Sequence, residues 1–264
     1  MTDELKKPTD DRNMSLVASD LSARLQRIRA RTPARILTGR AGAAYRTNVQ
    51  LDLRQAHAAA RDAVHGEMEL MSAFGGDFIR RWELFEVQSR ATGKDEYLLR
   101  PDLGRGFDES SRSKIQERCS RGGDLQIVIG DGLSVPAVSK QVPALLPLLH
   151  AGAQSAGWKV GRGFVIRYCR VGILNEIGEL LDPRVVILLI GERPGLATAE
   201  SLSAYLAYRP RGGHSDSDRN LISNIHARGV SSTEAAARIL SLAAQVMKAG
   251  VSGYTIKENR RSLS

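Results

Sequence analysis

The hydrophobic pattern of the chain centres on six consecutive apolar residues, positions 185–190. A run this short, made of Val, Ile and Leu, predicts a strand covered on both faces, as in a parallel sheet. Two glycines and a proline at 191–195 predict a sharp loop, and residues 197–208 are expected to form a helix. Glu192 therefore lies just beyond a strand end, where open α/β sheets bind ligands. A solvated turn residue is the alternative interpretation of Glu192.

The pattern on either side of this strand alternates between short apolar runs and longer amphipathic segments. Strands are predicted at 84–89, 125–129, 164–168 and 221–225, and helices at 109–119, 138–156, 173–181 and 232–249. A Ser/Thr cap and Glu234 in the first turn support the last of these helices. Strand and helix alternate about four times. This rhythm predicts an α/β fold with a Rossmann-like parallel sheet and helices on both faces.

The N-terminal third has a different pattern, with helical spacing and few strand signals. Residues 1–14 are polar and are predicted to form a disordered leader. Helices are predicted at 15–29 and 47–71, joined through a glycine- and arginine-containing loop at 38–47. A second fixed loop is expected at 100–106. The sequence thus predicts a leader, a mainly helical region over 15–80 and an α/β domain over 81–264.

Composition narrows the class of protein further. Of the 264 residues, 42% are hydrophobic, which is enough for a substantial core, and only two are cysteines. Two cysteines without a spacing pattern predict neither a disulfide framework nor a cysteine-based metal site, and they fit a reducing cytoplasm. The sequence contains no run of 18 apolar residues, so no membrane span is predicted. Residues 1–13 lack the apolar centre of a secretory signal.

The chain carries a formal net charge of +9, which raises the possibility of a polyanionic partner. Seven arginines stand close together: Arg24, Arg27, Arg29, Arg31, Arg35, Arg40 and Arg46. A solvated basic helix, or one that docks on an acidic protein face, explains them equally well. No zinc-finger spacing, RNA-binding motif or helix-turn-helix accompanies them, so no nucleic-acid partner is predicted.

Candidate chemistry is sparse. The segment Gly130-Asp131-Gly132 follows a predicted strand and precedes a helix, but it is not a GxGxxG loop, and a tight turn explains its glycines more simply. Histidines at 150, 214 and 226 have no serine or cysteine partner at a diagnostic spacing. The chain therefore shows no self-contained catalytic constellation. A binding site, or a site that another chain completes, is favoured, with a Rossmann-like nucleotide-binding domain of other function as the alternative.

Several longer motifs occur in a specific order. They are IGERPGLATAESLSAYLAYRPR, ISNIHARG, IGDGLS, TGRAGAAYRT, YLLRPDLGRG and RYCRVGILNEIGELL. Together they resemble the small subunit, or light chain, of ethanolamine ammonia-lyase, over residues 38–253. In TGRAGAAYRT this chain departs from the family's TGRAGPRPRT, which predicts a softer loop.

The resemblance implies a subunit of an adenosylcobalamin-dependent lyase that converts ethanolamine to acetaldehyde and ammonia by a radical mechanism. In that family the large subunit, a barrel, holds ethanolamine and most catalytic groups, and the small subunit closes over the cobalamin at their interface. The implied assembly is a hetero-oligomer, with residues 15–80 docking on the large subunit. The cofactor carries the difficult chemistry and the protein positions it.

The resemblance also implies three cobalamin-contacting residues, namely Val171, Glu192 and Leu221. Some relatives have cysteine where this chain has Leu221, so that contact is expected to be apolar or through the backbone. The chain lacks the Asp-x-His-x-x-Gly motif of mutases that replace the cofactor's own base with a histidine. The cofactor is therefore expected to stay base-on. The implied location is the cytoplasm, and packaging inside a bacterial microcompartment is left open.

Overall fold

The computed structural model describes residues 11–32 and 34–258, and the chain divides into two compact units between Arg54 and Gln55. The unit up to Arg54 contains α1 (Asp11–Ala30), the two-residue strands β1 (Arg40–Ala41) and β2 (Ala44–Tyr45), and the start of α2 (Thr47–His65). The helix predicted over 15–29 is confirmed within α1. The predicted leader lies outside the described residues up to position 10, and α1 includes positions 11–14.

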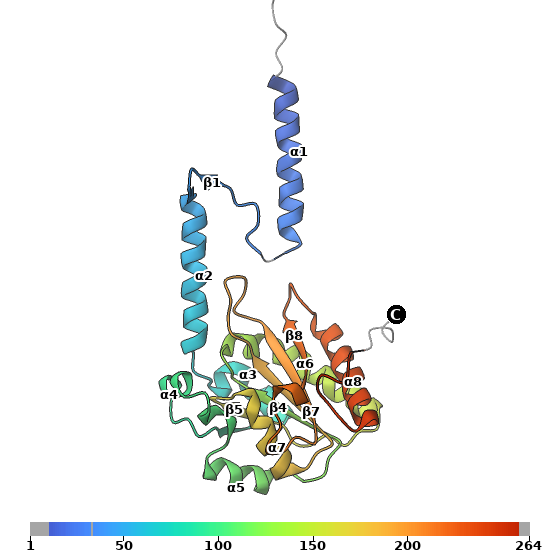
Figure 1. The fold of residues 1–264 in the computed structure, drawn as a ribbon. Coiled ribbons are helices and arrows are strands. Elements are labelled where there is room, and N and C mark those ends of the chain that lie inside the picture. The colour runs from blue at the N-terminus through green and yellow to red at the C-terminus, as the bar shows by residue number, and fades with distance from the viewer. Residues whose placement is uncertain (1–10, 33, 259–264) are drawn as a thin grey trace, which may run out of the picture. The chain divides into compact units, whose positions relative to one another are not determined.

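The second unit, from Gln55 onward, is built on a six-stranded mixed sheet (Figure 1). In spatial order its strands are β3 (Phe85–Gln88), β5 (Phe164–Arg167), β4 (Leu125–Gly130), β6 (Val185–Gly191), β7 (Leu202–Tyr208) and β8 (Asn220–Ile225). The first four are parallel, and β7 and β8 are antiparallel to their neighbours. The predicted parallel sheet is therefore correct for four strands, each close to its expected position.

The helix predicted over residues 197–208 is wrong, because its second half is strand β7. Alanine, leucine and glutamate favour a helix locally, but helix propensity is a weak preference that tertiary contacts override. Here residues 202–208 pair along their whole length with β6, from Leu202 opposite Gly191 to Tyr208 opposite Val185. This pairing supplies β6 with a second neighbour, and it turns the expected α/β repeat into an antiparallel edge.

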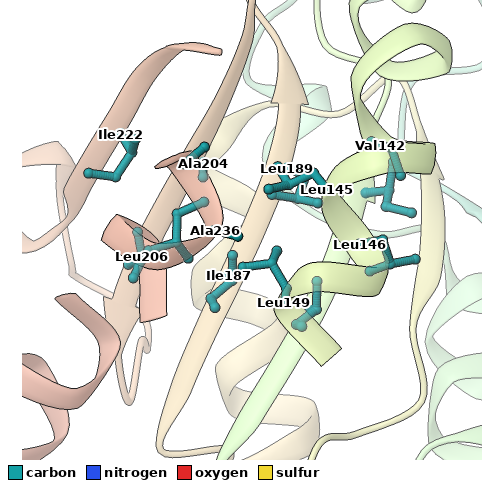
Figure 2. Packing of buried hydrophobic residues seen from close by; sticks show 14 of the residues in the cluster. Val142, Leu145, Leu146, Leu149, Ile187, Leu189, Ala204, Leu206, Ile222 and Ala236 are labelled. Carbon is teal, nitrogen blue, oxygen red and sulfur yellow. The ribbon is translucent and has the colours of Figure 1, made fainter. Parts of the chain in front are cut away.

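Helices cover both faces of the sheet, as predicted. One core cluster joins the sheet to α3 (Leu70–Arg81), α6 (Val135–Ser155) and α8 (Ser232–Ala249), and the other joins it to α5 (Glu109–Arg118) and α7 (Leu174–Leu181). Strand β6 serves both. Ile187 and Leu189 pack beneath α6 (Figure 2), whereas Val186 and Leu188 belong to the opposite cluster. Because side chains alternate across a strand, an unbroken apolar run is the signature of this double burial.

The helix predicted over residues 47–71 is confirmed up to His65, but its continuation to Met71 is wrong, since α2 ends at His65 and α3 begins at Leu70. Glu67 lies in the break, where its carboxylate accepts hydrogen bonds from Arg167 at 3.2 Å and from the Tyr168 hydroxyl at 2.9 Å. The turn between the helices is thereby joined to the end of β5. These partners stand about a hundred positions along the chain, so the local pattern carries no sign of them.

The remaining elements are one short helix and three 3₁₀ turns, which lie in the loops between the longer elements. They are α4 (Lys94–Leu99) and the 3₁₀ turns η1 (Leu103–Arg105), η2 (Val171–Ile173) and η3 (Asp216–Asp218). The predicted cap of α8 is confirmed, because Ser231 accepts a hydrogen bond from Glu234 N at 3.2 Å. None of the helices within the described ranges is long and apolar enough to cross a membrane.

Candidate functional site

A pocket of about 230 Å³ opens at the carboxyl ends of the parallel strands. Its walls come from the loops after β4, β5 and β6 and from the neighbouring antiparallel strands. Most of the lining is apolar or backbone, with a single carboxylate: Tyr97, Gly132, Leu133, Cys169, Arg170, Val171, Ile190, Gly191, Glu192, Arg193, Ser203, Tyr205 and Leu221. The pocket therefore lies at the edge of the sheet where α/β proteins place their ligand-binding groups.

All three residues predicted to contact a ligand line this one pocket. Val171 opens the 3₁₀ turn η2 and is half-buried, while Glu192 directly follows the last residue of β6. Leu221 lies on the edge strand β8, where 45% of its surface is exposed. The structure therefore brings together side chains from three separate segments. Their contact with cobalamin stays a prediction.

The carboxylate of Glu192 is held by three donors that the sequence pattern did not reveal. Ser201 Oγ donates to Glu192 Oε2 at 2.7 Å, and Ser203 Oγ donates to Oε1. The backbone N–H of Asn224 also donates to Oε1, at 3.2 Å. Since each carboxylate oxygen can accept about two hydrogen bonds, Oε2 keeps room for one more donor. The Glu192 carboxylate is therefore fixed in position, and its Oε2 can still accept a hydrogen bond from a ligand.

The two serines could have been found from the sequence only if their segment had been recognised as extended. Residues two apart point to the same side of a strand but to different sides of a helix. Ser201 and Ser203 therefore reach the same carboxylate in the observed conformation. The helix predicted for residues 197–208 would have separated them, so that error also hid this part of the site.

The turn after β8 fixes the third donor. Asn224 has a φ of 61°, and its Oδ1 lies 2.7 Å from His226 Nε2. His226 Nδ1 accepts the backbone N–H of Arg228 at 3.3 Å, which assigns the proton of the neutral ring to Nε2. A Cβ on Gly229 would lie 2.3 Å from Asn224 O, so only glycine fits there. His226, which had no catalytic partner in the sequence, is a positioning residue for this turn.

The loop after β4 forms the floor of the pocket, and it is a structural turn. Asp131 is fully buried, and its carboxylate accepts the backbone N–H groups of Tyr168 and Cys169, both at 2.8 Å. Gly132 has a φ of 59°, and a Cβ there would lie 2.2 Å from Gly191 O. Asp131 thus joins the loops after β4 and β5. The tight-turn interpretation of Gly130-Asp131-Gly132 accounts for these contacts.

Two cations lie over the ring of Tyr97 at the pocket wall. Arg170 Cζ is 4.2 Å and Lys94 Nζ 5.2 Å from the ring centroid. Lys94 is 6% exposed, and burial lowers the pKa of its amine, although the charge of Asp131 opposes this. Burial raises the pKa of Tyr97, so its hydroxyl stays protonated and donates to Cys169 O at 2.8 Å. This arrangement holds Arg170 at the pocket rim.

The thiols of the chain are poorly suited to nucleophilic chemistry. Both cysteines are free and buried, and burial raises the pKa of Cys119 to about 11 and that of Cys169 well above its usual value. A thiol in that state is protonated near neutral pH and is a weak nucleophile. In the described ranges, no cluster of three or more His, Cys, Asp or Glu side chains could hold a metal ion.

A pH-dependent loss of stability is expected from His226. Burial and the neighbouring charge of Arg228 lower the pKa of its ring, so protons bind more readily to the unfolded chain. Stability from the neutral ring is complete above about pH 6.5 and falls as the pH drops below that value. His226→Gln should cost about 1 kcal/mol at pH 7 and should flatten this acid-side decline. Thermal midpoints of both proteins between pH 7.5 and 5 would measure it; parallel curves would contradict the assignment.

Comparison with known proteins identifies the family. The profile of the ethanolamine ammonia-lyase light chain (EutC) family matches residues 22–257. A protein of Clostridium perfringens is 41% identical over 230 residues, covering 87% of this chain and 76% of its own length. One of Rhodopseudomonas palustris is 43% identical over 235 residues, covering 89% and 90%, respectively. Both are ethanolamine ammonia-lyase small subunits by name.

The matched region contains α/β elements, the pocket and all the residues that hold Glu192. The identities exceed 40% over most of each chain, which is far above the level at which only a fold is shared. The resemblance that the motifs first suggested thus extends over most of the chain. This chain belongs to the ethanolamine ammonia-lyase light chain family.

Proposed function

We propose that this chain is the small subunit of an adenosylcobalamin-dependent ethanolamine ammonia-lyase, which converts ethanolamine to acetaldehyde and ammonia. Its pocket would bind one edge of the cobalamin at the interface with a large subunit that holds ethanolamine. The observation that carries the proposal is the convergence of Val171, Glu192 and Leu221 on one pocket at the strand ends. The domain would then use its sheet as Rossmann-like domains do, with the ligand beyond the parallel strands.

The residues of the pocket fit an edge of a corrinoid. The corrin rim carries many amide groups, and Glu192 offers a carboxylate oxygen with acceptor capacity remaining. Val171 and Leu221 supply apolar surface beside it. A volume of about 230 Å³ is small for a whole ligand, since complete sites for drug-sized molecules span roughly 300–1,000 Å³. That size supports a site to which another chain contributes the rest.

In this assignment the bound cofactor would supply the radical chemistry, and this chain would supply position. Glu192 orients a polar edge of the ligand, the loop of Asp131 shapes the floor, and Arg170 stands at the rim. The two protonated thiols are protected from side reactions by their burial. The two free cysteines also support our proposal of a cytoplasmic location for the hetero-oligomer.

The isolated chain is expected to have no lyase activity. The lining of its pocket contains no histidine, and Cys169, the one cysteine of that lining, is held protonated. The volume of the pocket is that of a partial site. Activity should appear when the purified chain is mixed with the large subunit and adenosylcobalamin, as measured by acetaldehyde release from ethanolamine. The large subunit with cofactor alone serves as the control. Turnover by the small chain with cofactor but no large subunit would refute the division of roles.

The bound cobalamin is expected to keep its own dimethylbenzimidazole on cobalt. None of the five histidines of the sequence lines the pocket, and both ring nitrogens of His226 are already engaged. The test is an electron paramagnetic resonance spectrum of the complex loaded with cob(II)alamin, with both subunits labelled with nitrogen-15 at histidine. A splitting pattern that the label leaves unchanged agrees with the proposal. A pattern that follows the label would show a protein histidine on cobalt.

A further inference from the structure

A second, larger pocket adjoins the first, with which it shares Arg170 and Val171. Its volume is about 950 Å³, and it lies between the loops after β3 and β5, helix α7 and the turn η3. We call it the arginine pocket, because five arginines line it alongside three carboxylates. The arginines are Arg90, Arg105, Arg112, Arg170 and Arg219, and the acids are Glu176, Glu179 and Asp216. Positive charge is therefore in excess.

The carboxylates of the arginine pocket are committed to internal contacts. Glu176 accepts from Arg112 Nε through one oxygen and from Phe107 N, at 2.8 Å, through the other. Glu179 Oε1 accepts from Gly212 N at 2.7 Å. These bonds hold the loops around α7. The acids thus neutralise Arg112 and brace the backbone, and they leave other cations of the pocket without a counter-ion.

Three of the arginines have no carboxylate partner within the described part of the chain. Arg90 donates to the backbone oxygen of Asp102 at 3.2 Å, and Arg170 donates to Tyr97 O at 3.3 Å. The Arg105 side chain makes neither a hydrogen bond nor an ion pair there, and its stem lies against Gly172, where a Cβ would approach the Cγ of Arg105 to 2.8 Å. Three guanidinium groups, carried by three different loops, are therefore available to an anion.

The buried Arg219 adds a second, independent sign of a missing anion. Its side chain is only 4% exposed, and its Nε is buried without a hydrogen-bond partner among the described residues. Asp216 and Asn175 engage the other two nitrogens. Burial lowers the pKa of Arg219, and the like charge of Arg105 lowers it further, although Asp216 opposes both. A buried donor without an acceptor is costly, so an anion here would relieve both the orphaned donor and the repulsion.

We propose that the arginine pocket binds a phosphate group. Arginine forks match phosphate oxygens in paired hydrogen bonds, and a tetrahedral phosphate presents oxygens in several directions. It can thus meet arginines from the loops after β3 and β5 and from the turn η1 at once, whereas a planar carboxylate serves one or two. The phosphate is either free or part of a ligand that continues into the first pocket. The second source, a cobalamin phosphodiester, rests on the proposed function.

The first experiment is a titration of the full-length chain with inorganic phosphate at constant ionic strength, followed by the thermal midpoint. Arg105→Gln is the main variant, because its side chain is exposed and holds no internal contact that would unfold the protein. Arg90→Gln repeats the test at a second loop. Arg121→Gln, an exposed arginine outside both pockets, removes the same charge. Phosphate affinity should fall about tenfold in the two pocket variants and stay unchanged in the control.

The second experiment separates the two sources of phosphate. The assembled enzyme is titrated with cobalamin and with cobinamide, a corrinoid without the phosphate-bearing nucleotide. If the phosphodiester occupies the arginine pocket, Arg105→Gln should weaken cobalamin about tenfold and leave cobinamide unchanged. If the pocket binds free phosphate, both corrinoids should bind the variant as tightly as they bind the wild type. Inorganic phosphate should then bind the variant more weakly than the wild type.

The proposal is overturned if Arg105→Gln and Arg90→Gln bind inorganic phosphate and cobalamin as the wild type does. It is also wrong if these variants only weaken association with the large subunit, because the pocket would then be a docking surface for acidic side chains of a protein. Failure of the proposed function looks different. In that case the wild-type complex binds no corrinoid, yet the chain still binds phosphate through Arg105, and the arginine pocket stands.

Discussion

Replacing Glu192 with alanine should weaken cobalamin binding by the assembled enzyme about tenfold to hundredfold. A charged acceptor lost from a desolvated contact costs roughly 1.5–3 kcal/mol, and every 1.4 kcal/mol is about a factor of ten in affinity. The carboxylate is already oriented by Ser201, Ser203 and Asn224, so little ordering is needed when a ligand binds. The change therefore removes a preset acceptor, and its effect on affinity should be near the full value of the contact.

The glutamine variant separates binding from structure. Asn224 N–H can only donate, and it shares Oε1 with the Ser203 hydroxyl, so the amide oxygen of Glu192→Gln should take that position, whereas the Ser201 hydroxyl can turn to accept from the amide nitrogen. The loop then keeps its shape, and the atom that replaces Oε2 becomes a donor. Glu192→Gln should thus cost less affinity than Glu192→Ala. It should also leave the thermal midpoint of the cofactor-free complex close to that of the wild type.

Cobalamin affinity and the cofactor-free midpoint, measured side by side, decide the role of Glu192. Glu117→Gln, on an exposed carboxylate outside both pockets, is the matched control. Alanine also leaves the Asn224 N–H without its acceptor, so a moderate fall in the midpoint is expected for that variant alone. Unchanged affinity in both variants together with a lowered midpoint would mean that Glu192 only braces β7 and β8, and the proposed contact would be abandoned.

The largest loss of stability is expected from Asp131→Ala. This side chain is fully buried and accepts two backbone N–H groups from the loop after β5. Each buried donor left without an acceptor costs about 1–3 kcal/mol, so the free energy of unfolding should fall by roughly 3 kcal/mol or more. Asp131→Asn keeps the shape and one acceptor, and it should lie between alanine and the wild type.

Chemical denaturation of the full-length chain measures this effect. Asp95→Ala, at an exposed position in the first turn of α4, should stay within about 0.5 kcal/mol of the wild type. Because Asp131 joins two loops of the pocket floor, Asp131→Asn should also weaken cobalamin binding in proportion to the loss of stability. An Asp131→Ala protein as stable as the wild type would show that these two backbone groups do not depend on the carboxylate.

The sequence by itself determined the elements whose pattern is local. The apolar runs of β4 and β6 identify strands buried on both faces, and the Ser231 cap marks the start of α8. It also placed Glu192 just beyond a strand end, because the glycines and proline that follow β6 leave no other place for the strand to stop. Motif order alone pointed to the family that the comparisons confirmed.

Only the tertiary structure decided features that depend on partners far apart in the chain. Strand β7 exists because β6 offers it a pairing edge, and the break between α2 and α3 is held by Arg167 and Tyr168. The cradle of Glu192 and the arginine pocket likewise join loops that no spacing connects. Hydrogen bonds and charge pairs act through space over a few ångströms, while a sequence pattern records only neighbours within a few turns. The sequence therefore predicted where the site lies on the sheet, but its contacts between distant residues could be read only from the tertiary structure.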